Sequence, residues 1–434
     1  MSEIEINNEK IESLTSEIRE KKVEGLKEKI LENEEKKYAK STNFSYLEAE
    51  IKKYIANQDA DNALLSITKG SMDFGASDIH YETKENKVNL RMRIDGILVD
   101  IFSIENKDYK LLLERLKYES GLKLNITDIP QDGKYTKIID NKKIDVRVST
   151  IATKYGENVV CRVLDATKSI IDFEDLGFFW TTKRILEKAI NKKNGLILVT
   201  GPTGSGKTTT LYTIIKKLNT PDKKIITLED PIEYEVPGIV QAEVNEKKGF
   251  TFDIGLKALM RQDPDIIMVG EIRDYETLNT ATNASLTGHL VLSTLHTKSA
   301  GETLDRISNM GIKPYITAGA LDTIIAQRLV RKICPHCKQE VEKTSEETMV
   351  IESMLNEIGL KQLKGENIKL YRGSGCEKCN NTGYAGRIGV YEIIHLNNRL
   401  KEIIREGGDS REIIKEAREQ DMISMKEDGI LKAL

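Results

Sequence analysis

The stretch GLILVTGPTGSGKTTTLYTII, residues 195–215, decides the fold of this 434-residue chain. An apolar run leads directly into GPTGSGKT, residues 201–208, which matches the pattern G-x-x-x-x-G-K-[ST] in full, and a helical pattern follows. Glycines let backbone N–H groups turn inward around phosphate oxygens, and the helix presents its positive end to them. The stretch therefore predicts a strand, a phosphate-binding loop and a helix.

The residue types in this loop suit a nucleoside triphosphate with magnesium. Lys207 can reach the β- and γ-phosphates, and the hydroxyl of Thr208 can ligate Mg²⁺. No guanine-reading NKxD-type motif follows, which favours ATP over GTP. A glycine-rich turn that binds nothing is disfavoured because the whole motif stands in its proper context. We expect the nucleotide to be bound by Gly201, Pro202, Thr203, Gly204, Ser205, Gly206, Lys207, Thr208, Thr209 and Glu229.

Short apolar runs alternate with helical stretches from about residue 177 to 332. The runs are GLILVT, KIITLED, DIIMVGE and HLVLSTLH. Nearly continuous apolar strands separated by helices are typical of a parallel sheet covered on both faces. This part of the chain therefore predicts an α/β fold.

Polar side chains flank these runs, and a parallel sheet has its ligand crevice at the carboxyl ends of its strands. Hydrolysis of a γ-phosphate needs groups that hold magnesium, orient water and stabilise the transition state. The candidates are Glu229, Asp230, Glu233, Glu271, His289 and His296. Asp230, which precedes a proline, suits a helix cap equally well. For Glu271, directly after a buried strand, we favour a functional role.

Residues 44–165 show a different pattern. KVNLRMRIDGILVDI alternates polar and apolar residues around an Asp-Gly hairpin signal, and KKIDVRVSTI repeats the alternation. We expect a small α/β domain built on an antiparallel sheet. Residues 1–43 are dense in Glu and Lys, which predicts a solvated helical arm rather than a docking helix, and residues 166–176 are a candidate hinge.

Two C-x₂-C pairs, Cys334/Cys337 and Cys376/Cys379, predict a tetrathiolate zinc site within residues 334–383. Four protein ligands leave no open position, so the zinc is expected to be structural. Two unrelated pairs or a redox pair are the alternatives, but neither pair has a thioredoxin-like context. His336 could compete as a ligand. The fifth cysteine, Cys161, fits a small buried hydrophobe.

Taken together, GPTGSGKTTTLY, TLEDPIEY, LMRQDPDIIMVGEIRD and TGHLVLSTLHT resemble the Walker A, Asp box, Walker B and His box of type II secretion and type IV pilus traffic ATPases. GASDIHYE, RMRIDG and IPQDGK resemble the second N-terminal domain of that family. The resemblance implies a PAS-like domain over 44–165, a RecA-like P-loop core over 177–333 and a helical C-terminal region over 384–434. The tetracysteine element is similar to that of the assembly ATPases rather than the retraction ATPases.

The resemblance also implies roles for single residues. Glu233 would polarise the attacking water and Glu271 would serve the magnesium side, with the reverse left open. His289 and His296 would contact the γ-phosphate region. The arginine-finger candidates are Arg91 and Arg93, and more weakly Arg115, Arg147 and Arg162. The alternative for arginines that alternate along a strand is a solvated face.

The implied protein is a cytoplasmic homo-hexameric ATPase that uses ATP, Mg²⁺ and Zn²⁺ to power assembly of a type IV pilus or a type II secretion pseudopilus. It would associate peripherally with the inner membrane through a platform protein and a cytoplasmic docking protein, and would act on pilin indirectly. A net charge of −3 gives no reason to expect nucleic acid as a partner. The alternatives are a DNA-uptake or retraction ATPase and a non-hydrolysing nucleotide-binding scaffold. The start of the chain has no signal-peptide pattern, and no run is long enough to span a membrane.

Overall fold

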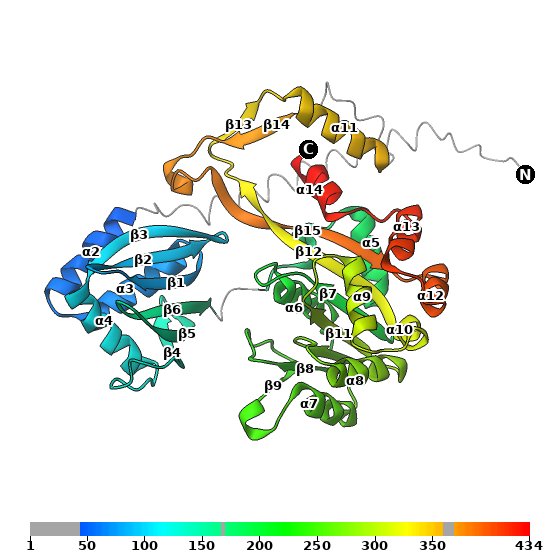
Figure 1. Cartoon of the computed structure of the whole chain (residues 1–434), viewed down its shortest axis with the longest axis horizontal. Helices are drawn as coiled ribbons and strands as arrows, with labels where there is room; N and C mark the ends of the chain where they lie inside the picture. The colour runs from blue at the N-terminus through cyan, green and yellow to red at the C-terminus, as the bar shows by residue number, and fades with distance from the viewer. Residues whose placement is uncertain (1–43, 166–169, 359–368) are drawn as a thin grey trace, which may run out of the picture.

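The computed structural model describes residues 44–165, 170–358 and 369–434. The predicted arm 1–43 lies outside the described residues, as do positions 166–169 of the predicted hinge. Two large sheets organise the chain, one of six strands and one of seven, and a two-stranded sheet accompanies them. Figure 1 shows the two large sheets in separate bodies, the first drawn in blue and cyan and the second mainly in green, yellow and orange.

The six-stranded sheet is antiparallel, with strand order β3-β2-β1-β6-β5-β4. Its strands are β1 (Ala76–Thr83), β2 (Lys87–Ile94), β3 (Ile97–Glu105), β4 (Gln131–Ile139), β5 (Lys142–Thr153) and β6 (Gly156–Asp165). The alternation along β2 buries Val88, Leu90 and Met92 completely, so Arg91 and Arg93 lie on the opposite face.

Three helices cover the apolar face of this sheet (Figure 1): α2 (Phe44–Ala56), α3 (Ala60–Asp73) and α4 (Asn106–Glu119). The expected small α/β domain on an antiparallel sheet is therefore present, and among the described residues no helix of this domain covers its arginine-bearing face.

The described part of the predicted hinge is held against the helix that follows the phosphate loop. Residues Phe173–Leu176 form the short helix η1, and Lys217 Nζ lies 4.0 Å from the centre of the Phe173 ring. Lys216 Nζ donates to the Ile170 carbonyl at 2.9 Å and to Asp172 Oδ1 at 2.8 Å. These contacts hold the described part of the predicted hinge against α6. This part would therefore move together with the body that carries the phosphate loop.

The seven-stranded sheet has the order β15-β12-β7-β11-β10-β8-β9, and every pair is parallel except β12 with β15. Its strands are β7 (Gly195–Thr200), β8 (Ile225–Glu229), β9 (Val240–Glu243), β10 (Ile266–Val269), β11 (Leu290–Leu295), β12 (Leu321–Ile333) and β15 (Tyr384–His395). All residues of β7, β10 and β11 are buried, which is what nearly continuous apolar runs predict.

Helices pack on both faces of this sheet, and each face has its own hydrophobic cluster. The helices are α5 (Trp180–Ile190), α6 (Lys207–Leu218), α7 (Phe252–Leu259), α8 (Tyr275–Leu286), α9 (Ala300–Asn309) and α10 (Pro314–Ala320), with short turns η2 (Glu246–Lys248) and η3 (Met260–Gln262). The predicted parallel-sheet α/β fold is confirmed.

The C-terminal region differs in one respect from the expectation. Its helices α12 (Asn398–Arg405), α13 (Ser410–Glu419) and α14 (Met425–Ala433) are present, but residues 384–395 form β15, an edge strand of the main sheet. The apolar run VYEII within this strand buries against β12 and the helices, so it joins the core rather than the helical tail. The elements between β12 and β15 are β13 (Lys338–Val341), α11 (Ser345–Glu357), β14 (Leu370–Gly373) and η5 (Glu377–Cys379).

Candidate functional site

The phosphate loop leaves the carboxyl end of β7 and enters α6 at Lys207. Gly206 has φ of +88°, a left-handed backbone that favours glycine. A Cβ at Gly201 would come within 2.6 Å of the Gln327 carbonyl oxygen, so the loop packs tightly on β12. The Ser205 hydroxyl is buried and has no hydrogen-bond partner among the described residues. A glycine-shaped cradle with an unsatisfied donor at the end of a helix fits a phosphate group.

Lys207 is turned back onto its own loop. Its Nζ donates to the carbonyls of Gly201 at 2.9 Å and Pro202 at 3.2 Å. Burial lowers the pKa of Lys207, nearby Glu271 opposes this shift and nearby Arg328 adds to it. Among the described residues, the hydrogen-bond acceptors of this buried ammonium are backbone carbonyls, which it can exchange for phosphate oxygens.

Gln327 on β12 supports the phosphate loop, and the sequence pattern did not single it out. Its Nε2 donates to the Ser205 carbonyl at 2.7 Å, and its Oε1 accepts from Thr210 Oγ1 at 2.8 Å. The residue is 1% exposed, so both bonds are sheltered from water.

Glu271 and His296 meet at the carboxyl ends of β10 and β11. His296 Nε2 lies 3.2 Å from Glu271 Oε2, and Arg273 forms an ion pair with the other carboxylate oxygen. Glu271 is largely buried, with its side chain 19% exposed, whereas the His296 side chain is 49% exposed. The charge of nearby Glu271 also acts on Lys207, where it opposes the lowering of the pKa by burial. Lys207, Glu271 and His296, three of the predicted residues, therefore lie at one edge of the sheet.

Gly270 has no steric requirement of its own. A Cβ there would be 3.4 Å from the Leu228 carbonyl oxygen, an ordinary contact, and Gly270 N donates to the same oxygen at 2.8 Å. Gly270 stands where many P-loop ATPases carry an aspartate, and the space at this position would admit a side chain. The carboxylate that directly follows it is that of Glu271.

Glu233 lies in the segment between β8 and β9 and is half-buried. Among the residues that the structure describes, none forms a hydrogen bond or ion pair with its carboxylate. Arg147 from β5 reaches the same segment, since its guanidinium donates to the Ile232 carbonyl at 3.4 Å. The six-stranded sheet thus contacts the Asp-box loop within a single chain.

Glu229 occupies a closed network instead of an open site. Its Oε2 accepts from Tyr212 OH at 2.5 Å, and its Oε1 accepts from Thr227 Oγ1 at 2.6 Å and from Gln241 Nε2 at 3.3 Å. Burial raises the pKa of Glu229, and these hydrogen bonds oppose the shift. These contacts satisfy the carboxylate within the described chain, and the expected contact of Glu229 with a nucleotide stays a prediction.

His289 is at the other edge of the sheet. It precedes β11, and its Nδ1 lies 3.0 Å from the Ala284 carbonyl oxygen at the end of α8. The six residues of β11 put about 20 Å between it and His296. Within one chain, the two predicted histidines are therefore separated by the length of the strand.

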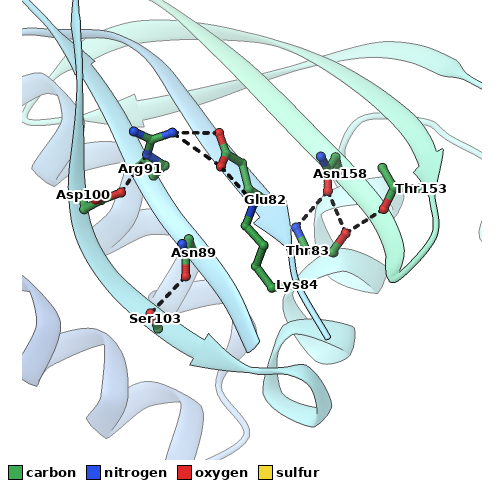
Figure 2. Close-up of polar contacts among 9 residues, drawn as sticks. All are labelled: Glu82, Thr83, Lys84, Asn89, Arg91, Asp100, Ser103, Thr153 and Asn158. Carbon is green, nitrogen blue, oxygen red and sulfur yellow. Dashed lines mark hydrogen bonds and ion pairs between the residues drawn. The ribbon is translucent and has the colours of Figure 1, made fainter. Parts of the chain in front are cut away.

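Arg91, Arg93 and Arg162 lie on the face of the six-stranded sheet opposite its helices. Figure 2 shows Arg91 between Glu82 and Asp100: its Nη1 is 3.2 Å from Glu82 Oε1 and its Nε is 2.7 Å from Asp100 Oδ1. Arg93 and Arg162 share the buried carboxylate of Asp78, with their Nε atoms 3.7 and 3.0 Å from its oxygens.

These contacts account for the arginines within the isolated chain, and the solvated-face alternative stays open for them. Arg115, on α4, is paired with Asp61 at 2.5 Å and with Glu119.

The four cysteines of the two pairs converge. All four sulfur atoms lie within 4.8 Å of one another. The measured separations are 3.9 Å for Cys334–Cys376, 3.8 Å for Cys337–Cys379 and 3.7 Å for Cys376–Cys379. A tetrahedral zinc with bonds of about 2.3 Å requires sulfur separations of about 3.8 Å.

Backbone donors favour a thiolate at one of the four sulfurs, whereas burial raises the pKa of Cys334 to about 12 and also raises that of Cys337. Backbone N–H groups of Cys376 and Gly383 point at the Cys379 sulfur at 3.2 and 3.3 Å. They outweigh burial and lower the pKa of Cys379 to about 7. His336 Nδ1 lies 3.5 Å from Lys378 Nζ, and the compact group of potential ligands contains no histidine. The donor set fits zinc with four sulfur ligands. Cys161 is a separate buried thiol, as expected.

The family model described as "Type II/IV secretion system protein" matches residues 57–434. The chain is 43% identical over 359 residues to the "Type IV pilus assembly ATPase PilB" of Thermus thermophilus, covering 83% of this chain and 40% of that protein. It is 42% identical over 358 residues to the "Type II secretion system ATPase E" of Vibrio cholerae, covering 82% of this chain and 69% of that protein.

A solved structure shares the architecture. The crystal structure of the pilus retraction motor PilT with bound ADP matches with a TM-score of 0.53 and 26% identity, over 84% of this chain and 95% of that one. Within the described parts of the chain, no helix has the length and apolar content needed to cross a membrane.

Proposed function

Because the chain belongs to the type II/IV secretion system protein family, we propose that it is the ATP-hydrolysing motor that drives assembly of a type IV pilus or a type II secretion pseudopilus. The observation that carries the proposal is the meeting of the phosphate loop, Glu271 and His296 at one edge of the parallel sheet. The high identity to assembly and secretion ATPases, against 26% to a retraction motor, supports extension over retraction.

The proposed reaction is in-line attack of water on the γ-phosphorus of ATP. Glu233 accepts a proton as the water oxygen bonds to phosphorus, and the bond from phosphorus to the bridging oxygen breaks, giving ADP and phosphate. Lys207 leaves the loop carbonyls and contacts the β- and γ-phosphates. Thr208 and Glu271 hold magnesium, which neutralises charge on the phosphate oxygens when bound. His296 sits against Glu271 and fixes its orientation toward the γ-phosphate region.

The working assembly in this proposal is a homo-hexamer on the cytoplasmic face of the inner membrane, docked through a platform protein and a cytoplasmic partner. The domain division at 44–165, 166–176 and 177–333 is part of it. ATP binding closes the two bodies about the hinge and hydrolysis reopens them. His289, at the opposite edge of the sheet from the phosphate loop, would act with Arg91 and Arg93 at the contact between neighbouring copies.

Gene deletion in the host separates extension from retraction. Loss of the chain should abolish surface fibres or secretion, and re-expression of the wild type should restore them. Re-expression of Lys207→Ala at the same level should not. Fibres that accumulate after deletion would instead identify a retraction motor. A Lys207→Ala chain that restores fibres fully would support the scaffold alternative.

Zinc at the four cysteines is proposed as a structural ion. Elemental analysis of the purified chain should give about one zinc per chain, and Cys337→Ser should lower that content. Cys161→Ser is the matched control, since this thiol lies in the other body, and it should keep the zinc. Equal zinc content in both variants and the wild type would place the ion elsewhere.

A further inference from the structure

Arg328 lies on β12 beside the phosphate loop. This cation has no part in the proposed reaction as described so far. It is half-buried, and no carboxylate of the described residues lies within ion-pair distance of its guanidinium. Its Nη1 donates to the Gln327 carbonyl at 2.9 Å, and its Nη2 donates to the Lys298 carbonyl at 2.9 Å. Most other arginines near this site, such as Arg273, have acidic partners.

The position of Arg328 ties it to Lys207. The Gln327 carbonyl, which accepts from Arg328, is the oxygen against which Gly201 packs, and the Gly201 carbonyl accepts from Lys207. The two cations therefore hold neighbouring backbone carbonyls at the root of the loop. Their proximity is also seen in the effect of Arg328 on Lys207, whose pKa it depresses.

Lys207 and Arg328 are two cations close to one another, and Glu271 is the carboxylate whose charge is seen to act on Lys207. An anion bound between the two cations would be stabilised by both of them. The charge of Glu271 is already shared with Arg273 and His296. A planar guanidinium with five donors can keep one backbone acceptor while its remaining donors bind a phosphate. A terminal phosphate held by the loop would lie among these groups.

We propose that Arg328 is a further phosphate-binding residue of the same chain, which contacts the terminal phosphate of a bound nucleoside triphosphate and couples it to the His296 loop through the Lys298 carbonyl. The proposal rests on the proposed function, because it takes ATP as the ligand. When the terminal phosphate leaves after hydrolysis, Arg328 loses one acceptor and retains the carbonyl of Lys298. The loop that carries His296 would thus sense whether a γ-phosphate is present.

The test is the preference for triphosphate over diphosphate. Dissociation constants are measured for ADP and for the β,γ-imido analogue of ATP, both with Mg²⁺, on the wild type, Arg328→Gln and Arg328→Lys. Arg306→Gln is the control, because Arg306 is an exposed arginine on α9. A phosphate contact predicts that Arg328→Gln weakens analogue binding about tenfold more than ADP binding, and Arg328→Lys at least about threefold more, because lysine lacks the fork. Arg306→Gln should keep the wild-type ratio.

Several outcomes overturn the proposal. An unchanged ratio in both Arg328 variants does so, and so does an equal loss of both affinities, which would show that Arg328 only holds the loop. If Arg328→Gln does not fold, the ratio in Arg328→Lys decides. A wild-type chain that binds the analogue but releases no phosphate from ATP refutes the proposed function and leaves this binding ratio as an independent result.

Discussion

Two histidines, His289 and His296, flank strand β11 and have different surroundings at its two ends. At its carboxyl end, His296 touches Glu271 and lies on the same edge as the phosphate loop. At its amino end, His289 is bonded to a carbonyl of α8, and Asp322 nearby on β12 is paired with Lys192 and His395. The carboxyl edge carries cations and carboxylates whose partners a nucleotide could replace. At the amino edge, His289 and Asp322 are bonded to groups of the same chain, so we regard this edge as structural.

The two carboxylates of the carboxyl edge give the largest expected effect. Glu271→Gln and Glu233→Gln should each lower ATP turnover by about 100-fold or more, since each removes a group with a direct part in the reaction. Glu233→Gln should keep the wild-type magnesium dependence, while Glu271→Gln should need more magnesium. Glu276→Gln, an exposed change at the start of α8, should have no effect. An increased magnesium requirement in Glu233→Gln alone would exchange the two roles.

Support of the loop by Gln327 should give the next effect. Gln327→Ala leaves Thr210 Oγ1 and the Ser205 carbonyl without their buried partner, at a cost of about 1–3 kcal/mol for each group. We expect about tenfold weaker nucleotide binding, measured by fluorescence titration, with ADP and ATP analogues equally affected. Gln339→Ala, on the exposed strand β13, serves as the control. Wild-type affinity in Gln327→Ala would mean that the loop holds its shape without β12.

The two histidines test the comparison within a single strand. His296→Ala should lower turnover about tenfold because Glu271 loses a hydrogen-bonded neighbour, a loss of about 1.4 kcal/mol. His289→Ala should leave the turnover of isolated chains unchanged. Turnover is measured below and above the concentration at which the chain assembles. If His289→Ala lowers turnover only in the assembled state, His289 acts across a contact between copies. If His289→Ala and His296→Ala lower the turnover of isolated chains equally, the two edges of the sheet do not differ in function.

Asp322 should give the smallest effect, and on stability alone. Burial by itself would raise the pKa of Asp322, but hydrogen bonds and charge from His395 and Lys192 outweigh it and lower the pKa. The contribution of its ionised form is therefore present above the unfolded pKa of about 3.9 and is lost as the pH falls through the folded value.

Asp322→Asn should thus lower the free energy of unfolding at pH 7 by about 1–2 kcal/mol, and the difference should close below about pH 4. Chemical denaturation at several pH values measures it, with turnover per folded chain unchanged. A deficit that stays constant as the pH is lowered through the folded pKa of Asp322 would show that the packing of Asp322, not its charge, is what matters.

Much of this edge could be predicted from the sequence, because its signals are local. A complete G-x-x-x-x-G-K-T after an apolar run fixes a strand, a loop and a helix together, and Glu271 directly follows a buried strand. The spacing within the two C-x₂-C pairs itself predicts the zinc site. These features need no knowledge of which strands are neighbours.

The features that were missed depend on strand order. Gln327 and Arg328 lie far from the loop in sequence and reach it only because β12 is the neighbour of β7. The position of His289 could have been anticipated, since parallel strands end at one edge and a residue preceding a strand must lie at the other. Glu229 was expected to bind nucleotide from its place at a strand end, and that contact stays a prediction. Its hydrogen bonds to Tyr212 and Gln241 could not be assigned from the pattern.

Phosphate release from ATP by the purified chain, measured beside Lys207→Ala, tests the central claim most directly. The account predicts magnesium-dependent release by the wild type at concentrations that support assembly, and a loss of about 1,000-fold or more in Lys207→Ala, because the triphosphate loses its main cationic contact in the loop. Equal release by both proteins, or no release by a wild-type chain that assembles and binds ATP, would contradict it.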